Sequence, residues 1–438
     1  METKLTLEYV VEPAQQGLFL FLPFEMPVNV ETLHLSYQYA RHQENAAPVG
    51  AVIYTSRTEI NIIDLGLIAP DGTQVGASGS DKAEFDLSDV AATPGYRPHA
   101  LTPGAWQILV GAYKVAAGGV KVTYELTFTY KRRRLLKGDL HAHTLASDGV
   151  LTVEELAARA VRHGLDFVAI TDHNQIVSRA ELRHVGGVTL IPGVEWTHYQ
   201  GHANFLGADR PYDGSFAANT ADEIRRRFEQ AHERGALIMI NHPMDESCGF
   251  QLDWQNLPHD VLEIWNGPMR VSNLQAVGLW HSLLAAGRKL PAVGGSDYHR
   301  DSPFLFLGGP TTCVFALSNS VADILQALRE GHAYITFAPD GPWLEMNAGG
   351  ALMGETVSWP AVQSLEICAG GLLKGDVLRV VTASNSEALV QAAEDGSLQV
   401  VYPVTGSGFV RVEILRSFLP GLPLLPALIS NPIYFGAS

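Results

Sequence analysis

The sequence predicts an α/β protein with β-rich regions on both sides of an α/β centre. Between residues 135 and 338, apolar strands alternate with amphipathic helices, a pattern typical of a parallel α/β sheet or barrel. Before residue 130, short alternating stretches are separated by Pro-Asp-Gly and Gly-Gly turns, and after about residue 340 the chain is again Gly-rich and strand-like. We therefore expect three domains: an N-terminal β-sandwich at 1–133, an α/β domain at 134–340 and a C-terminal β-rich unit at 341–438.

In the central region the predicted strands and helices follow one another in about seven β/α steps. The strands are expected at Leu135–His141, Phe167–Thr171, Thr189–Val194, Ala203–Leu206, Leu237–Ile240, Val261–Ile264 and Leu290–Val293. The helices are expected at 152–163, 220–234, 271–286 and 320–330, where Thr152 starts the first and Gly235 and Gly331 follow the second and the last. This number of steps is typical of a barrel, although an open sheet has the same count.

Composition and charge limit the classes of protein that this chain can be. No apolar run reaches the roughly 20 residues that a membrane span needs, and the start lacks the basic end and apolar stretch of a signal peptide, so we expect a cytoplasmic protein without membrane contact. The formal net charge of −16 argues against a nucleic-acid partner. The three cysteines lie far apart and are interpreted as buried apolar residues.

Histidines and carboxylates follow several predicted strands, at the sheet edge where α/β folds build their sites. The clusters are Gly138-Asp139-Leu140-His141-Ala142-His143 with Asp148 in the next loop, Thr171-Asp172-His173-Asn174, Pro192-Gly193-Val194-Glu195 with His202 beyond it, Asn241-His242-Pro243, and Ser296-Asp297-Tyr298-His299. In a strand, His141 and His143 point the same way, so both imidazoles can meet one cation. A single such histidine is more often structural, but five clusters at strand ends together indicate a metal site.

The residue types in these clusters narrow the choice of metal. Imidazole and carboxylate ligands without thiolate suit Mn²⁺, Fe²⁺ or Zn²⁺. Nine candidate ligands are too many for one ion, and a carboxylate such as Glu195 can bridge two cations. The sequence therefore predicts two or three divalent metal ions.

With these motifs in this order, residues 135–340 resemble the PHP (polymerase and histidinol phosphatase) superfamily. The resemblance implies a distorted (β/α)7 barrel and a division of the ligands. His141, His143, Glu195 and Asp297 would hold one ion, Glu195 would bridge to a second ion held by His202 and His242, and Asp148, His173 and His299 would hold a third. The β-rich flanks and the closing Ser430-Asn431-Pro432-Ile433-Tyr434 are similar to the branch that includes carbaryl hydrolases and phosphodiesterase-like enzymes.

The predicted function is hydrolysis of phosphomono- or phosphodiesters of small molecules by metal-activated hydroxide at a di- or trinuclear centre. The same hydroxide attacks carbonyls, so a carboxylester or carbamate hydrolase is the first alternative, and a non-catalytic binding or scaffold protein around a structural metal centre is the second. An exonuclease is disfavoured by the negative charge. Near the ligands, His198 is a candidate general acid, Arg300 a candidate to grip a phosphoryl oxygen, and Asn174 and Asn266 candidate substrate donors. The sequence does not indicate the oligomeric state.

Overall fold

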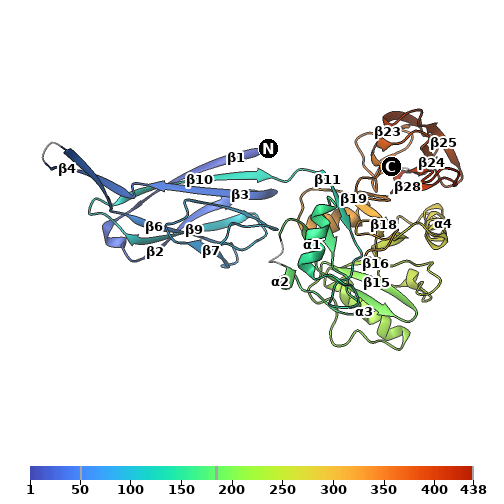
Figure 1. Cartoon of the computed structure of the whole chain (residues 1–438), viewed down its shortest axis with the longest axis horizontal. Helices are drawn as coiled ribbons and strands as arrows, with labels where there is room; N and C mark the ends of the chain where they lie inside the picture. The colour runs from blue at the N-terminus through green and yellow to red at the C-terminus, as the bar shows by residue number, and fades with distance from the viewer. Residues whose placement is uncertain (50–51, 183–185, 437–438) are drawn as a thin grey trace. The chain divides into compact units, whose positions relative to one another are not determined.

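The computed structural model describes residues 1–49, 52–182 and 186–436, and the side chains of 45–49 and 52–55 are outside the described part. The chain divides into two compact units, Met1–Arg132 and Arg133–Ser438 (Figure 1).

The first unit consists of antiparallel strands. One sheet has the order β1 (Glu2–Val11), β10 (Val120–Tyr130), β3 (Val30–Tyr39) and β8 (Glu84–Ser88). The other has the order β2 (Phe19–Met26), β9 (Gly104–Lys114), β6 (Ile62–Ile68) and β7 (Gln74–Ser78), and β4 (His42–Val49) pairs with β5 (Val52–Glu59). Buried side chains of both four-stranded sheets, such as Leu35 and Trp106, belong to one hydrophobic cluster. The alternation of buried and exposed residues along β10 shows why the sequence forms strands here.

The second unit is an α/β structure with more strand than helix, which confirms the predicted class. Its larger sheet runs in the order β13 (Thr189–Ile191), β12 (Phe167–Ala169), β11 (Arg134–Asp139), β19 (Thr311–Ala316), β20 (Ala333–Thr336), β28 (Leu425–Ser430), β27 (Gly408–Arg416), β24 (Val377–Val381) and β25 (Ser386–Gln391). In addition, β29 (Ile433–Gly436) pairs with β27, and β22 (Thr356–Ser358) pairs with β29. Its second sheet runs in the order β14 (Gly193–His198), β15 (Gly201–Leu206), β16 (Leu237–Ile240), β17 (Val261–Asn266) and β18 (Ala292–Gly295). A third sheet contains β21 (Trp343–Asn347), β23 (Ser364–Leu372) and β26 (Gly396–Pro403).

Buried residues from β11, β12 and β13 share a hydrophobic cluster with residues from β15, β16 and β17, for example Leu136 with Met239. The two larger sheets of this unit are therefore packed against a common interior. The order of strands does not by itself establish a closed barrel, and the seven-step barrel and the N-terminal sandwich stay predictions.

The helices lie where the sequence predicts them. They are α1 (Val153–Arg162), α3 (Ala221–Glu233), α4 (Val271–Ala285) and α5 (Val321–Arg329), together with the short α2 (Arg179–Leu182). The Thr152 side chain accepts a hydrogen bond from the backbone N–H of Glu155, and the Glu155 side chain accepts one from the N–H of Thr152, so α1 starts with a capping box. Thr220 and Glu223 form the same box on α3. Buried apolar residues of α3 and α4 share a cluster with β15, β16 and β17, which fixes these helices on the second sheet.

The C-terminal strands continue the larger sheet, because β28 pairs with β20. Next to this pairing, the Asn431 side chain accepts a hydrogen bond from the N–H of Ala292 at 2.7 Å and donates to the carbonyls of Ala292 and Ala333 at 2.9 Å. Asn431 therefore ties the end of the chain to β18 and β20. This gives a structural role to the Ser430–Tyr434 motif.

Candidate metal centre

The predicted ligands lie at or just beyond the ends of strands of the second unit. His141 and His143 follow β11, His173 follows β12, Glu195 and His202 lie within β14 and β15, His242 follows β16, and Asp297 and His299 follow β18. Short parallel bridges join neighbouring strand ends, Ala142 with Tyr298 and His173 with Glu195. These bridges hold segments far apart in the sequence at one place.

Glu195 lies at the centre of the cluster and is 1% exposed. Its Oε1 is 3.3 Å from His141 Nε2, 3.1 Å from His202 Nδ1 and 3.4 Å from His242 Nε2. Its Oε2 is 2.7 Å from His173 Nδ1 and 3.5 Å from His143 Nε2. One carboxylate therefore faces five imidazoles, the arrangement that a bridging ligand requires.

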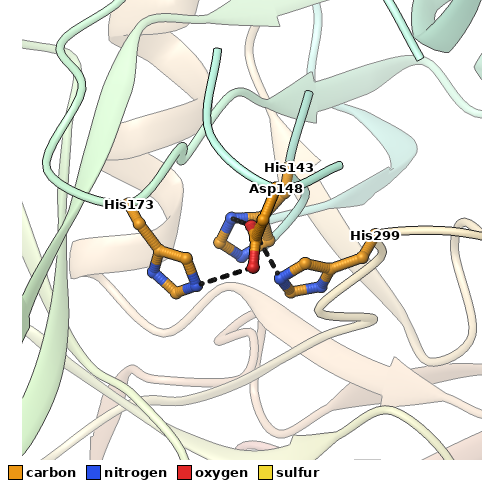
Figure 2. Close-up of side chains that lie close together, drawn as sticks. All are labelled: His143, Asp148, His173 and His299. Atoms are coloured by element: carbon orange, nitrogen blue, oxygen red, sulfur yellow. Dashed lines mark ion pairs between the residues drawn. The ribbon is translucent and has the colours of Figure 1, made fainter. Parts of the chain in front are cut away.

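A more exposed group surrounds Asp148 (Figure 2). The Asp148 carboxylate is 3.1 Å from His299 Nε2, 3.8 Å from His173 Nε2 and 3.9 Å from His143 Nδ1. The Asp148 side chain is 55% exposed, whereas that of His143 is fully buried. This group is open on the side of Asp148, so solvent or substrate can approach there.

The remaining predicted ligand, Asp297, forms a group of potential ligand atoms with His141 and His242. Asp297 Oδ1 is 3.1 Å from His143 Nε2 and 3.5 Å from His141 Nε2. All nine predicted ligands belong to one or more groups whose donor atoms lie within 4.8 Å of one another, and one of these groups adds a cysteine to the set: His202, His242 and Cys248. Cys248 Sγ is 3.5 Å from His242 Nδ1. The interpretation of all three cysteines as buried is wrong, because Cys248 and Cys368 are only partly buried and Cys248 lies on a polar loop beside the cluster.

The donor atoms fit divalent cations. His141 Nε2, which faces Glu195 and Asp297, and His143 Nδ1, which faces Asp148, are buried and, within the described residues, have no hydrogen-bond partner. Buried polar atoms are normally paired, so orphaned imidazole nitrogens beside carboxylates indicate a missing partner. Imidazole nitrogens and carboxylate oxygens are ligands that Mn²⁺, Fe²⁺ and Zn²⁺ accept.

The electrostatics of the cluster also favour the binding of cations. Burial alone would raise the pKa of Glu195, but the neighbouring His141, His173 and His202 hold this pKa well below its usual range. Burial alone would lower the pKa of His141, but Asp297, Glu195 and Glu263 raise it well above its usual value. Without metal, the buried carboxylates therefore keep protons on nearby imidazoles, and cations can take the place of those protons.

A second layer of buried side chains positions the predicted ligands. Glu263 Oε1 is 3.0 Å from His141 Nδ1, and Glu263 Oε2 accepts from the backbone N–H of His242 at 2.8 Å. Asn241 Nδ2 donates to Glu195 at 2.9 Å. Such outer partners orient ligating imidazoles and carboxylates.

Two aspartates hold the loops that carry ligands. Asp139 accepts hydrogen bonds from the backbone N–H groups of Ser296 at 2.9 Å and His141 at 3.2 Å, which joins the ends of β11 and β18. Asp172 accepts from the N–H and hydroxyl of Thr144, each at 2.7 Å, and from the Ser147 hydroxyl at 2.7 Å, which shapes the turn before Asp148. The sequence motifs contain both aspartates, but their roles as supports were not predicted.

Backbone strain concentrates at the same place. Asn174, His242 and Asp297 have positive φ angles of 52°, 25° and 53°. Residues other than glycine adopt this region at a cost, and Asn and Asp adopt it more readily than most. The strain at His242 is opposed by the hydrogen bond from its N–H to Glu263.

The four predicted substrate or acid residues differ in their surroundings. His198 uses both ring nitrogens, because Nε2 is 3.1 Å from the Ala218 carbonyl and Nδ1 accepts from the N–H of Gln200 at 3.1 Å. The side chain of Asn174 bonds to the backbone of Thr197, and that of Asn266 donates to Asp297 at 3.3 Å. Both amides therefore support the site. Arg300 is exposed, next to His299.

A cavity of about 540 Å³ opens beside His202. Its wall includes Tyr199, which is 99% exposed, and Phe216, which is 43% exposed. Trp196 Nε1 donates a hydrogen bond to the Phe216 carbonyl at 2.9 Å, which fixes the loop that carries Phe216. The His198 ring is stacked on Trp196 at 5.3 Å and contacts the same loop through Ala218.

Comparison with known proteins identifies the class to which this arrangement belongs. Residues 139–259 match the PHP domain family, which confirms the resemblance seen in the sequence for this part of the chain. The 5'-3' exoribonuclease Rnm of Salmonella typhimurium is 32% identical over 152 residues, which are 33% of this chain and 45% of that protein. The 3',5'-nucleoside bisphosphate phosphatase of Chromobacterium violaceum is 33% identical over 107 residues, 23% of this chain and 37% of that protein. The chain spans less than half the length of these curated relatives.

A solved structure from Bacteroides vulgatus, a two-domain protein containing a predicted PHP-like metal-dependent phosphoesterase, aligns with 68% of this chain and 95% of its own. Its TM-score is 0.42 and its sequence identity is 19%.

The expectation that nucleic acid is not a partner is wrong as an inference from charge, since proteins similar to this chain are 5'-3' exoribonucleases. Net charge is a sum over the whole surface, whereas clustered metal ions create a local positive field at the site. Among the helices of the described ranges, none is long and apolar enough to cross a membrane.

Proposed function

We propose that the chain is a metal-dependent phosphoesterase whose centre is built from His141, His143, Asp148, His173, Glu195, His202, His242, Asp297 and His299. The observation that carries the proposal is the gathering of these nine side chains, in which six imidazoles face the carboxylates of Glu195, Asp148 and Asp297. The names of the relatives support a phosphoester as the bond that is cleaved, because an exoribonuclease and a bisphosphate phosphatase both act on phosphate esters.

Two or three divalent ions, Mn²⁺, Fe²⁺ or Zn²⁺, would occupy the centre and supply Lewis-acid chemistry and a water of lowered pKa. The residues of the site would act either as metal ligands or as hydrogen-bond partners that orient those ligands. Glu195 is proposed to bridge, and Glu263 to keep the His141 imidazole in one orientation through its Nδ1. Asn266 is proposed to orient Asp297, in place of a direct contact with substrate.

The organic part of the substrate is proposed to occupy the cavity beside His202. Phe216 and Tyr199 offer exposed aromatic surface there, on which a planar group such as a nucleobase can stack. His198 is proposed to hold this wall, because protonating a leaving group from Nε2 would break its hydrogen bond to Ala218. Arg300 keeps its proposed role at a phosphoryl oxygen, since no hydrogen bond or ion pair among the described residues occupies it.

The test is a comparison of esters and variants. With Mn²⁺ or Zn²⁺ added, the enzyme should hydrolyse a nitrophenyl phosphodiester faster than nitrophenyl acetate, and Asp297→Asn should reduce that rate by about 100-fold or more as a ligand is lost. Asp222→Asn, an exposed aspartate on α3, is the matched control and should leave the rate unchanged. Faster cleavage of the acetate would instead favour the carboxylester or carbamate hydrolase. A rate that survives loss of metal in Asp297→Asn would favour a scaffold protein.

A further inference from the structure

A second cavity lies between helix α4 and the C-terminal strands of the larger sheet. Its volume is about 490 Å³, and it is lined by Gly278 and His281 of α4, Arg379 of β24, Ser384 of the following loop, and Arg411 of β27. None of these residues belongs to the metal centre described above.

The floor of this cavity carries more positive than negative charge. The buried Glu413 carboxylate accepts hydrogen bonds from Arg411 and, at 2.9 Å, from Arg379 Nε. The side chains of Glu413 and Arg411 are 1% and 4% exposed, and that of Arg379 is 34% exposed. Two guanidinium groups thus share one carboxylate, so the triad keeps a formal charge of about +1 because arginine stays protonated.

Polar atoms at the same place lack partners. Among the residues that the structure describes, Arg411 Nε and His281 Nδ1 are buried and make no hydrogen bond. The Arg411 guanidinium lies over the Trp280 ring, 5.1 Å from its centroid, which covers one face of the cation with an apolar surface. A buried charge with an unused donor is costly unless a further acceptor completes it.

The mouth of the cavity is made of groups that donate hydrogen bonds. Residues 382–386 read Thr-Ala-Ser-Asn-Ser, and the stretch from Ala383 to Ser386 is exposed. The Thr382 hydroxyl accepts from the N–H of Asn385, so the loop has a fixed turn. Hydroxyl, amide and guanidinium donors around an uncompensated positive charge are the surroundings that an oxyanion needs.

We propose that this cavity is a binding site for a small molecule that carries a phosphate or carboxylate oxyanion, held by Arg411, Arg379 and the Thr382–Ser386 loop. The volume suits a small molecule. The site is independent of the metal centre and of the reaction proposed there.

The experiment titrates the full chain with inorganic phosphate and, separately, with malonate, by isothermal calorimetry at constant ionic strength. The protein is first treated with chelator so that metal ions cannot bind the probes. Saturable binding of either probe is expected, and the probe that binds more tightly identifies the oxyanion. Hydrogen exchange measured with and without the probe should show protection confined to residues 382–386 and the adjoining strands.

Two variants weaken the site in different ways. Arg379→Gln removes a guanidinium from the triad, and Ser384→Asp places a negative charge on an exposed position at the mouth. Each should weaken binding about tenfold or more, the value of a lost charge-assisted hydrogen bond or an added repulsion. Arg210→Gln, an exposed arginine paired with Asp213, is the matched control and should bind like the wild type.

The proposal is overturned if neither probe binds, if both Arg379→Gln and Ser384→Asp bind as tightly as Arg210→Gln, or if the protection lies elsewhere. Thermal unfolding of each variant without probe shows whether it is folded. Because Ser384→Asp changes an exposed residue, it decides the matter even if Arg379→Gln is unstable.

Discussion

Glu263 lies between apolar neighbours in strand β17, and its two carboxylate oxygens serve two different predicted ligands, His141 and His242. The sequence indicates that Glu263 has a partner, because a charged residue inside the apolar run Val261-Leu262-Glu263-Ile264-Trp265 is buried only when another group compensates its charge. Position at strand ends pointed to the predicted ligands but passed over this support, which lies three residues before the last residue of β17.

The Glu263→Gln variant should keep the fold and lose metal affinity. Glutamine has nearly the same shape but offers one acceptor instead of two, so His141 is held less firmly and the cluster loses a negative charge. We expect metal content or activity to fall by about 10- to 100-fold, the effect of removing an outer partner of a ligand. Metal analysis after dialysis against dilute metal measures this, with the exposed Glu366→Gln as control. Equal metal content in both variants would show that Glu263 has no such role.

Metal loading should release protons. Burial would lower the pKa of both His141 and His242, but nearby carboxylates raise the pKa of His141 well above its usual value, and the Cys248 thiol together with Glu195 and Glu263 does the same for His242. A raised pKa means that the metal-free imidazoles keep their protons at neutral pH, and a cation must displace them. Apparent affinity should therefore rise with pH, and metal loading at pH 7 should release protons. Calorimetry in buffers of different ionisation enthalpy counts these protons, and release of none would contradict the assignment.

At the scale of elements, the hairpin of β14 and β15 determines how the site faces substrate. It is antiparallel within a sheet whose later strands are parallel, and the pairing of Thr197 with His202 brings Glu195 and His202 to one end. The same hairpin carries Trp196 and His198, which fix the loop of Phe216. The sequence predicted the strands and the two ligands, but not the loop that packs on Trp196, because that contact depends on the fold.

The Phe216→Ala variant should bind substrate more weakly without losing its chemistry. Loss of a stacking surface is worth about 1–3 kcal/mol, so KM for a nucleotide or aryl phosphate should rise about fivefold or more while kcat changes little. Phe19→Ala, an exposed phenylalanine of the first unit, is the control. A fall in kcat at unchanged KM would place Phe216 outside the binding surface.

On the scale of the whole molecule, the two units have separate hydrophobic clusters, and the cluster of the first unit contains only residues between Leu5 and Tyr130. The sequence predicted a change of pattern near this point because alternation with a period of two gives way to β/α repeats. It could not predict the sharing of a sheet by β20 and β28, since pairing between strands so distant in sequence leaves no local pattern. Net charge was the weakest guide, because an average over the surface does not describe one site.

Removal of residues 1–132 should leave the metal centre intact. All nine predicted ligands and their supports lie in the second unit, which has its own core. The remaining chain should bind the same number of ions as the full chain and keep its activity on nitrophenyl phosphates. Metal content, activity and thermal unfolding of the two forms, compared side by side, measure this. A folded second unit without metal would show that the first unit contributes to the centre.

Because Glu195 lies against five imidazoles, the proposed ions should be difficult to remove or exchange one at a time. A ligand common to several ions makes their occupancies interdependent, so the loss of Glu195 cannot subtract a single ion. Selective depletion has to begin at the periphery, with Asp148 or Cys248, which lie at opposite ends of the chain of donor groups. In the proposed centre, an ion at the edge would therefore be exchanged more easily than the ions held by Glu195 in the middle.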